Sequence, residues 1–177
     1  MNTTILFIIQ AVIAAVTCLA AAIFDIRSNQ IPNKLTFPVI GIGLIFTLIT
    51  QPIITFVIAF ISIIIWFFLG MTNFMGLGDI KLIMAITAIG GCHMGVVSFI
   101  IGILFLCLFA LITNPLETGI YIHKMLRRLR FKKEAIYKNS TKYKFAPFLL
   151  LGVIVYVLFV DKYSPFMFDF KRFFWGV

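Results

Sequence analysis

The sequence Gly76-Leu77-Gly78-Asp79 lies between two long apolar runs, and its aspartate begins the second of them. Another aspartate, Asp25, closes the first apolar run of the chain. A charged side chain within a membrane-spanning helix costs roughly 2.5 to 3.5 kcal/mol on insertion scales, and it usually persists because it serves chemistry or transport. Two such residues, each at the end of an apolar helix, predict a shared functional site.

Composition indicates that this chain folds in a membrane. Of its 177 residues, 62% are hydrophobic and 12% are charged, and the mean hydropathy is +1.12. A soluble domain would be closer to half apolar. The first apolar run, from Ile5 to Phe24, lacks the basic start and small-residue cleavage site of a removed signal peptide. We therefore expect an all-α, multi-pass membrane protein in which residues 1–177 form a single transmembrane domain.

Interruptions in the apolar pattern predict about six spans, each of about twenty residues or somewhat fewer. Thr50-Gln51-Pro52 divides the long run Leu35–Leu69, because proline favours a turn there. Glycines interrupt the pattern at Gly70–Gly78 and Gly90–Gly95, and a polar segment covers Asp25–Lys34. The expected spans are Thr4–Phe24, Leu35–Thr50, Pro52–Leu69, Asp79–Ile89, Val96–Thr113 and Pro147–Val160.

The distribution of charge predicts an orientation. The net charge is +9, and nine of the fifteen basic residues lie between Lys124 and Lys144. The positive-inside rule places this basic loop, residues 117–146, in the cytoplasm and the N-terminus outside. We expect the loop to contact anionic lipid headgroups rather than nucleic acid. The tail, residues 161–177, mixes aromatic and basic side chains and suits a membrane interface.

This orientation brings the two aspartates to the same membrane face, because Asp25 ends the first span and Asp79 begins the fourth. Two neighbouring carboxylates cannot both ionise easily and tend to share one proton. The ionised partner is able to take a proton from an attacking water, while the protonated partner donates to the oxyanion or leaving amine. This chemistry requires no metal or cofactor, and His93 and His123 lack partners at metal-ligand spacing.

Three segments resemble the type IV prepilin peptidases and the related archaeal preflagellin peptidases, which are membrane aspartic proteases of the GxGD kind. Asp25, followed seven residues later by Pro32-Asn33, looks like the first aspartate motif of that family. The run from Gly76 through Asp79 to Lys81 looks like the second motif, GxGDxK. The segment from Lys144 to Gly152 is similar to the start of the last core helix. GxGD alone is a weak signal, but both motifs in this order are specific.

The resemblance implies that Asp25 and Asp79 are the catalytic pair of an aspartic endopeptidase without metal or cofactor. Lys81 would bias the protonation of the pair or meet lipid headgroups. The other motif residues would shape the active-site loop or contact the substrate: Pro32, Asn33, Gly76 and Gly78.

The implied substrate is a prepilin-like membrane protein whose basic leader is cut at the cytoplasmic face. The enzyme would reside in the plasma or inner membrane and serve type IV pilus assembly or protein secretion. The paired CxxC motifs of the larger family members are missing from this sequence, so we expect a short form that does not methylate its product. The sequence leaves the oligomeric state open.

The residues leave other functions open. A preflagellin peptidase or another GxGD intramembrane protease would use the same two carboxylates. In a small proton-coupled transporter, Asp25 and Asp79 would relay protons instead. A third possibility is a non-catalytic assembly subunit, in which Asp79 only caps its helix and Asp25 pairs with Arg27 or Lys34.

Overall fold

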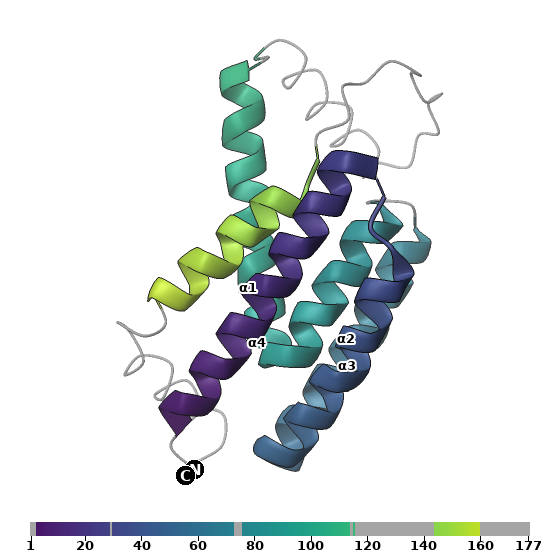
Figure 1. The fold of residues 1–177 in the computed structure, drawn as a ribbon, viewed down its shortest axis with the longest axis vertical. Helices are drawn as coiled ribbons and strands as arrows, with labels where there is room; N and C mark the ends of the chain where they lie inside the picture. The colour runs from purple at the N-terminus through teal and green to yellow at the C-terminus, as the bar shows by residue number, and fades with distance from the viewer. Residues whose placement is uncertain (1–2, 29, 73–75, 114, 116–143, 160–177) are drawn as a thin grey trace.

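The computed structural model describes residues 3–28, 30–72, 76–113, 115 and 144–159, and all regular structure among them is helical (Figure 1). Most of the predicted basic loop and all of the predicted interfacial tail lie outside these residues. The helices are α1 (Thr3–Ser28), α2 (Asn33–Thr50), α3 (Ile53–Met71), α4 (Leu77–Thr113) and a shorter helix, Ala146–Phe159.

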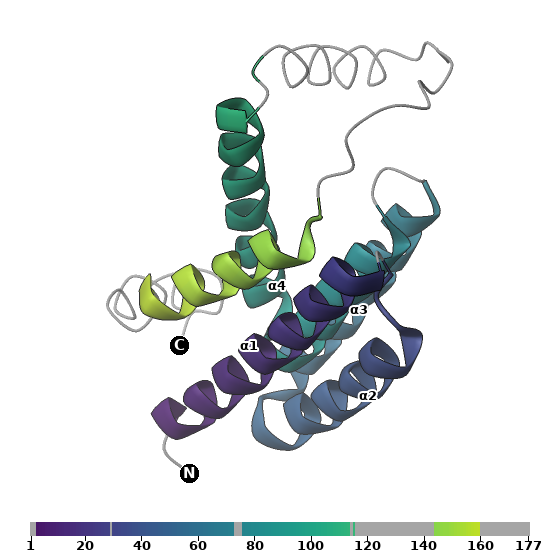
Figure 2. The same cartoon turned by 45° about the horizontal axis from the view of Figure 1, so that its top comes forward.

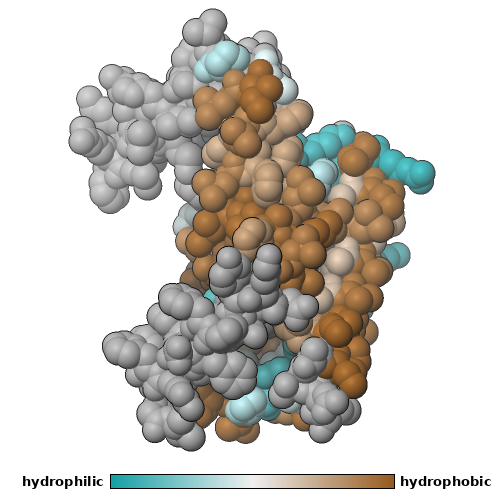
Figure 3. Space-filling model, turned by 90° about the vertical axis from the view of Figure 1, so that its left-hand side faces the viewer, coloured by the Kyte–Doolittle hydropathy of each residue, from teal (hydrophilic) through white to brown (hydrophobic). Residues whose placement is uncertain are grey.

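Four of these helices, α1 to α4, are long and apolar enough to cross a membrane. Large apolar side chains are exposed along them, with Ile49 77% and Ile112 73% accessible. Figure 3 shows apolar side chains covering much of the described surface on one face. Such extensive exposure of apolar surface marks a membrane-facing exterior. The expectation of an all-helical membrane protein is confirmed, while six spans and the orientation stay predictions.

Helix α4 reverses direction at Gly91, where φ is 79° and ψ is 174°. Residues with a Cβ rarely adopt this conformation, so glycine suits the position. A Cβ added at Gly95 would collide with Thr87, which means that the two halves fold back against each other. Figures 1 and 2 show the second half returning along the bundle and then standing apart from α1 to α3. The predicted interruption at Gly90–Gly95 is therefore present.

The first half of α4 forms the centre of the bundle. Residues 82–89 are all buried, and α1, α2 and α3 each contact α4. Helix α2 approaches most closely at Gly43, where an added Cβ would lie 2.9 Å from the carbonyl carbon of Ala88. The Thr47 hydroxyl donates a hydrogen bond to the Ala88 carbonyl at 2.8 Å. Small residues and hydroxyls of this kind are typical of close helix contacts in membranes.

The Ala146–Phe159 helix packs on the second half of α4. A Cβ at Gly102 would lie 3.2 Å from the Leu149 Cα atom, so the two backbones are nearly in contact. His93, just beyond the reversal in α4, is hydrogen-bonded to the Tyr156 hydroxyl at 3.2 Å. His93 therefore has a structural partner at the end of the bundle remote from Asp79.

The polar segment expected at Asp25–Lys34 was too long. Helix α1 continues to Ser28 and α2 begins at Asn33, so only residues 29–32 lie between them. The Ser28 hydroxyl donates to the Phe24 carbonyl at 2.8 Å, and the Lys144 ammonium donates to the Ile26 carbonyl at 2.8 Å. The Lys144 bond satisfies a carbonyl in the last turn of α1, where a helix end leaves carbonyls without intrahelical partners. Asp25 consequently lies inside the helix rather than beyond it.

Candidate active site

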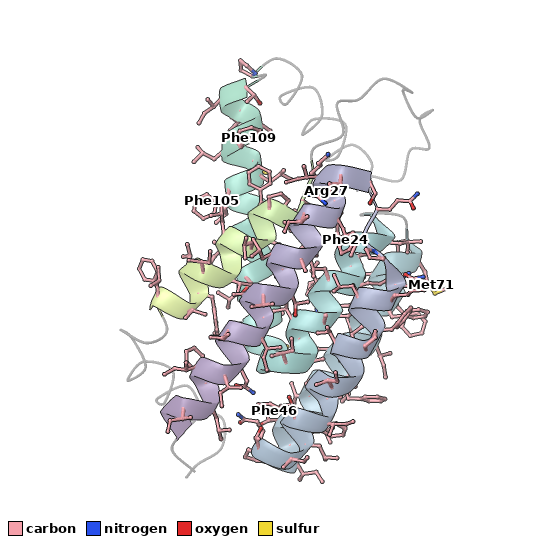
Figure 4. All side chains as sticks on the ribbon, viewed as in Figure 1. Phe24, Arg27, Phe46, Met71, Phe105 and Phe109 are labelled. Atoms are coloured by element: carbon pink, nitrogen blue, oxygen red, sulfur yellow. The ribbon has the colours of Figure 1, made fainter. Side chains whose placement is uncertain are left out.

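Asp25 lies in the last turns of α1 and is half-buried. Figure 4 shows its neighbours Phe24 and Arg27 at the end of that helix. One turn earlier, Ala21 and Ala22 are buried, and their small side chains let this part of α1 approach the core closely. The Oδ2 atom of Asp25 is buried and has no hydrogen-bond partner among the described residues. A buried polar atom left unpaired is costly, and such exceptions in native proteins often mark reactive sites.

Asp79 lies in the first turn of α4 and is also half-buried. It is not the residue that caps the helix, because α4 begins two residues earlier at Leu77. A Cβ at Gly76 would lie 2.9 Å from the Asp79 Oδ2 atom, so any other residue at this position would displace the carboxylate. The Ile80 amide donates to the Gly76 carbonyl at 3.2 Å and closes the first turn. The positive end of the helix dipole favours a carboxylate here.

The fold brings Asp25 and Asp79 together at one end of the bundle. Their helices are antiparallel across this contact, with α1 ending where α4 begins (Figure 1). The two carboxylates are near enough to interact electrostatically. Neighbouring carboxylates hold one proton more easily than none, because two adjacent negative charges repel each other. This arrangement is therefore suited to offering an acid and a base to one water molecule.

Among the other predicted site residues, Gly78 and Lys81 of the second motif lie against the first motif. An added Cβ at Gly78 would lie 3.4 Å from the Ile31 Cβ atom, so the buried Ile31 side chain rests on this glycine. The Lys81 ammonium donates to the Asn33 Oδ1 atom at 2.7 Å. It also lies 5.4 Å from the centre of the Phe37 ring. Lys81 thus meets the start of α2, a contact that the sequence did not predict.

Pro32 begins the first turn of α2. Its φ of −69° and ψ of 136° are extended, and its carbonyl accepts hydrogen bonds from the Leu35 and Thr36 amides at 3.0 Å and 3.4 Å. Proline suits this place because its fixed φ prepares the chain for the helix that follows. It therefore sets where α2 starts, and with it the position of Asn33.

Two residues in or beside the resembling segments were not predicted as site residues. The Lys144 ammonium donates to the carbonyl of Ile26, the residue that follows Asp25, so a cation lies against the last turns of α1. Thr36 is completely buried, and its hydroxyl has no hydrogen-bond partner in the described ranges. Both residues lie in or next to segments that resemble the family, since Lys144 opens the third segment and Thr36 comes three residues after Asn33. Their residue types alone, however, would not mark them as site residues without the fold.

The described ranges contain no group of three His, Cys, Asp or Glu side chains arranged to hold a metal ion. Cys18 is buried, Cys92 and Cys107 are half-buried, and all three thiols are free. The end of the bundle that carries Asp25 and Asp79 also carries the Lys81–Asn33 hydrogen bond and the Lys144 ammonium.

Comparison with known proteins adds one finding to this geometry. A family model described as the type IV leader peptidase family matches residues 12–112. The matched range contains Asp25, Asp79 and the contacts between their motifs, whereas the segment from Lys144 to Gly152 lies beyond it. Neither the curated proteins nor the solved structures contain a match to the chain.

Proposed function

Because this chain belongs to the type IV leader peptidase family, we propose that it is an aspartic endopeptidase that removes the basic leader from prepilin-like precursors. Family membership makes the chain a peptidase, and its long apolar helices make it a membrane protein. The aspartic mechanism, this substrate and cleavage at the cytoplasmic face of the plasma or inner membrane are the proposal.

The proposed reaction uses the aspartate pair with one shared proton. The ionised carboxylate accepts a proton from water as the water oxygen attacks the scissile carbonyl carbon. The protonated carboxyl donates to the carbonyl oxygen as negative charge develops there, and the amide nitrogen then leaves with a proton. The unpaired Oδ2 atom of Asp25 supports this role, because it is a carboxylate oxygen still able to accept a hydrogen bond.

The observation that carries the proposal is the meeting of Asp25 and Asp79 within the range that the peptidase family matches. These residues are 54 positions apart in the sequence, and each lies at the end of an apolar helix. A structural role for either aspartate alone would not require the other to be close. Two carboxylates that interact electrostatically in a membrane protein instead favour shared proton chemistry.

The test is cleavage of a co-expressed prepilin-like precursor by Asp25→Asn and Asp79→Asn variants. Each change preserves size and removes one ionisable carboxyl, so each is expected to lower the cleavage rate by about a thousandfold or more. Immunoblots of precursor and product measure the rate, and the amount of membrane-inserted variant is measured in parallel.

Asp169→Asn is the matched control, because it removes the same charge outside the range that the family matches. It should cleave at the rate of the unaltered protein. Normal cleavage by either Asp25→Asn or Asp79→Asn would contradict the aspartic mechanism.

Proton-coupled transport is the competing function, since it would use the same two carboxylates. It predicts a proton flux in liposomes that Asp25→Asn and Asp79→Asn both abolish. Purified protein that cleaves its precursor in liposomes without such a flux separates the two functions.

A further inference from the structure

We propose that the short connector between α1 and α2 is a positioning element. Through its contacts with the start of α4, it fixes the position of Asp25 relative to Asp79. Two contacts make up this tie: Ile31 against Gly78, and Asn33 with Lys81. The inference rests on the proposed peptidase activity and assigns Asn33 and Lys81 to alignment of the catalytic pair rather than to substrate binding.

The tie joins the parts of the chain that carry the aspartates. Asp25 lies in α1, which ends at Ser28, and the described connector residues 30–32 lead directly into Asn33. Gly78 and Lys81 flank Asp79 in the first turns of α4. A shift of the connector relative to α4 therefore shifts the end of α1 relative to Asp79. Reactions of this kind are sensitive to such shifts, because a displacement of about 1 Å costs on the order of a hundredfold in rate.

The direction of the Lys81 side chain excludes a direct partnership with Asp79. Residues two apart on a helix point to different faces, so Lys81 and Asp79 do not face each other. The Lys81 ammonium instead lies 2.7 Å from Asn33 Oδ1 and over the Phe37 ring, both in the first turns of α2. The Lys81 side chain therefore links α4 to α2 through a hydrogen bond and a cation–π contact.

The second contact is a fit of shapes. Ile31 is 9% exposed, and its Cβ, Cγ1 and Cδ1 atoms all lie 3.4 to 3.6 Å from the place where a Gly78 Cβ would be. A methyl group at position 78 would be in ordinary van der Waals contact with Ile31, whereas a large side chain there would occupy the place of the Ile31 side chain. A small residue between Leu77 and Asp79 thus lets the connector lie close to the turn that carries the second aspartate.

The first experiment is a double-mutant cycle on cleavage of a purified prepilin-like precursor in detergent. Lys81→Met and Asn33→Ala are each expected to lower kcat by about tenfold or more while KM changes less than about twofold. Because both remove the same bond, the double variant should be no slower than the slower single variant. Asn33→Asp, which keeps an acceptor oxygen for Lys81, should restore much of the kcat that Asn33→Ala loses.

Lys34→Met is the matched control, because Lys34 is an exposed lysine beside Asn33. It should leave kcat and KM unchanged. Multiplicative effects of Lys81→Met and Asn33→Ala on kcat, or a loss expressed mainly in KM, would overturn the tie and assign these residues to substrate binding.

The second experiment uses size compensation at the other contact. Gly78→Ala should change kcat little, because its methyl group fits against Ile31. Gly78→Leu should lower kcat, and adding Ile31→Ala should restore part of it, because the smaller side chain makes room for the leucine. Failure of Ile31→Ala to restore any activity would overturn this half of the proposal.

A third measurement is independent of activity. Spin labels are attached at Arg27→Cys and Leu77→Cys, both exposed positions, after Cys18, Cys92 and Cys107 are replaced. The distance distribution should be narrow and should broaden or shift with Lys81→Met. An unchanged distribution overturns the tie even if Asp25→Asn and Asp79→Asn are inactive, whereas active aspartate variants overturn the proposed function itself.

Discussion

At the scale of single residues, the buried threonine hydroxyls of α2 differ in whether they form a hydrogen bond. The Thr47 hydroxyl is buried and donates to the Ala88 carbonyl, whereas the equally buried Thr36 hydroxyl has no partner among the described residues. Removing a hydroxyl that makes a bond loses stability, while removing one that makes none loses little or gains. The two threonines on the α4-facing side of α2 therefore form a natural comparison.

We predict that Thr47→Val lowers the free energy of unfolding by about 0.5 to 1.5 kcal/mol, the net contribution of a typical intramolecular hydrogen bond. Thr36→Val should leave the stability unchanged or raise it. Unfolding in increasing SDS or by heating measures both, with the unaltered chain as reference. A larger loss of stability for Thr36→Val than for Thr47→Val would contradict the hydrogen-bond assignment.

The same scale explains why the sequence left two roles open for Lys81, an effect on the protonation of the aspartate pair and contact with lipid headgroups. The spacing Asp79-x-Lys81 invites an electrostatic partnership, yet the helix points these side chains to different faces. Only the position of α2 supplies Asn33 and Phe37 as its neighbours.

At the scale of helices, the closeness of α2 and α4 depends on glycine at one position of α2 and not at another. Gly43 faces the backbone of Ala88 and Ile89, both 2.9 Å from the place of an added Cβ. Gly41 has no atom within 4 Å of its own added Cβ and is exposed. The same substitution at these two positions should therefore have opposite effects.

We predict that Gly43→Ala destabilises the protein by about 1 to 3 kcal/mol, as overpacking of a tight contact does. Gly41→Ala should be neutral or stabilising by about 0.5 to 1 kcal/mol, because alanine loses less backbone entropy in a helix. Unfolding curves of the two variants check this. Equal effects at both positions would mean that α2 does not approach α4 as closely as described.

At the scale of the whole molecule, the aspartate pair requires that α1 ends and α4 begins at one side of the bundle. Figure 4 shows Phe24 and Arg27 of α1 and Met71 of α3 toward the same end. The positive-inside rule predicts that this end faces the cytoplasm, where a basic leader would be cut.

This orientation is tested by single cysteines placed at opposite ends of the bundle in a background without the native cysteines. Gln51→Cys, between α2 and α3, should react with a membrane-impermeant maleimide in intact cells. Gln30→Cys, between α1 and α2, should react only after the membrane is opened. The reverse pattern would place the aspartates on the outer side and would contradict cleavage at the cytoplasmic face.

The length of the apolar runs was sufficient to predict a helical membrane protein, because each segment in the hydrocarbon of a bilayer must satisfy its own backbone hydrogen bonds. The interrupting glycines and prolines predicted the breaks near Pro52 and Gly90–Gly95. The pairing of Asp25 with Asp79 was expected from their places in the two motifs. Helix ends were predicted less well, since α1 extends to Ser28, and one carbonyl of its last turn is bonded by Lys144, more than a hundred residues away. Lys81 with Asn33, Ile31 with Gly78 and Lys144 with Ile26 arise from how the helices pack, and no local pattern encodes a contact between residues so distant in sequence.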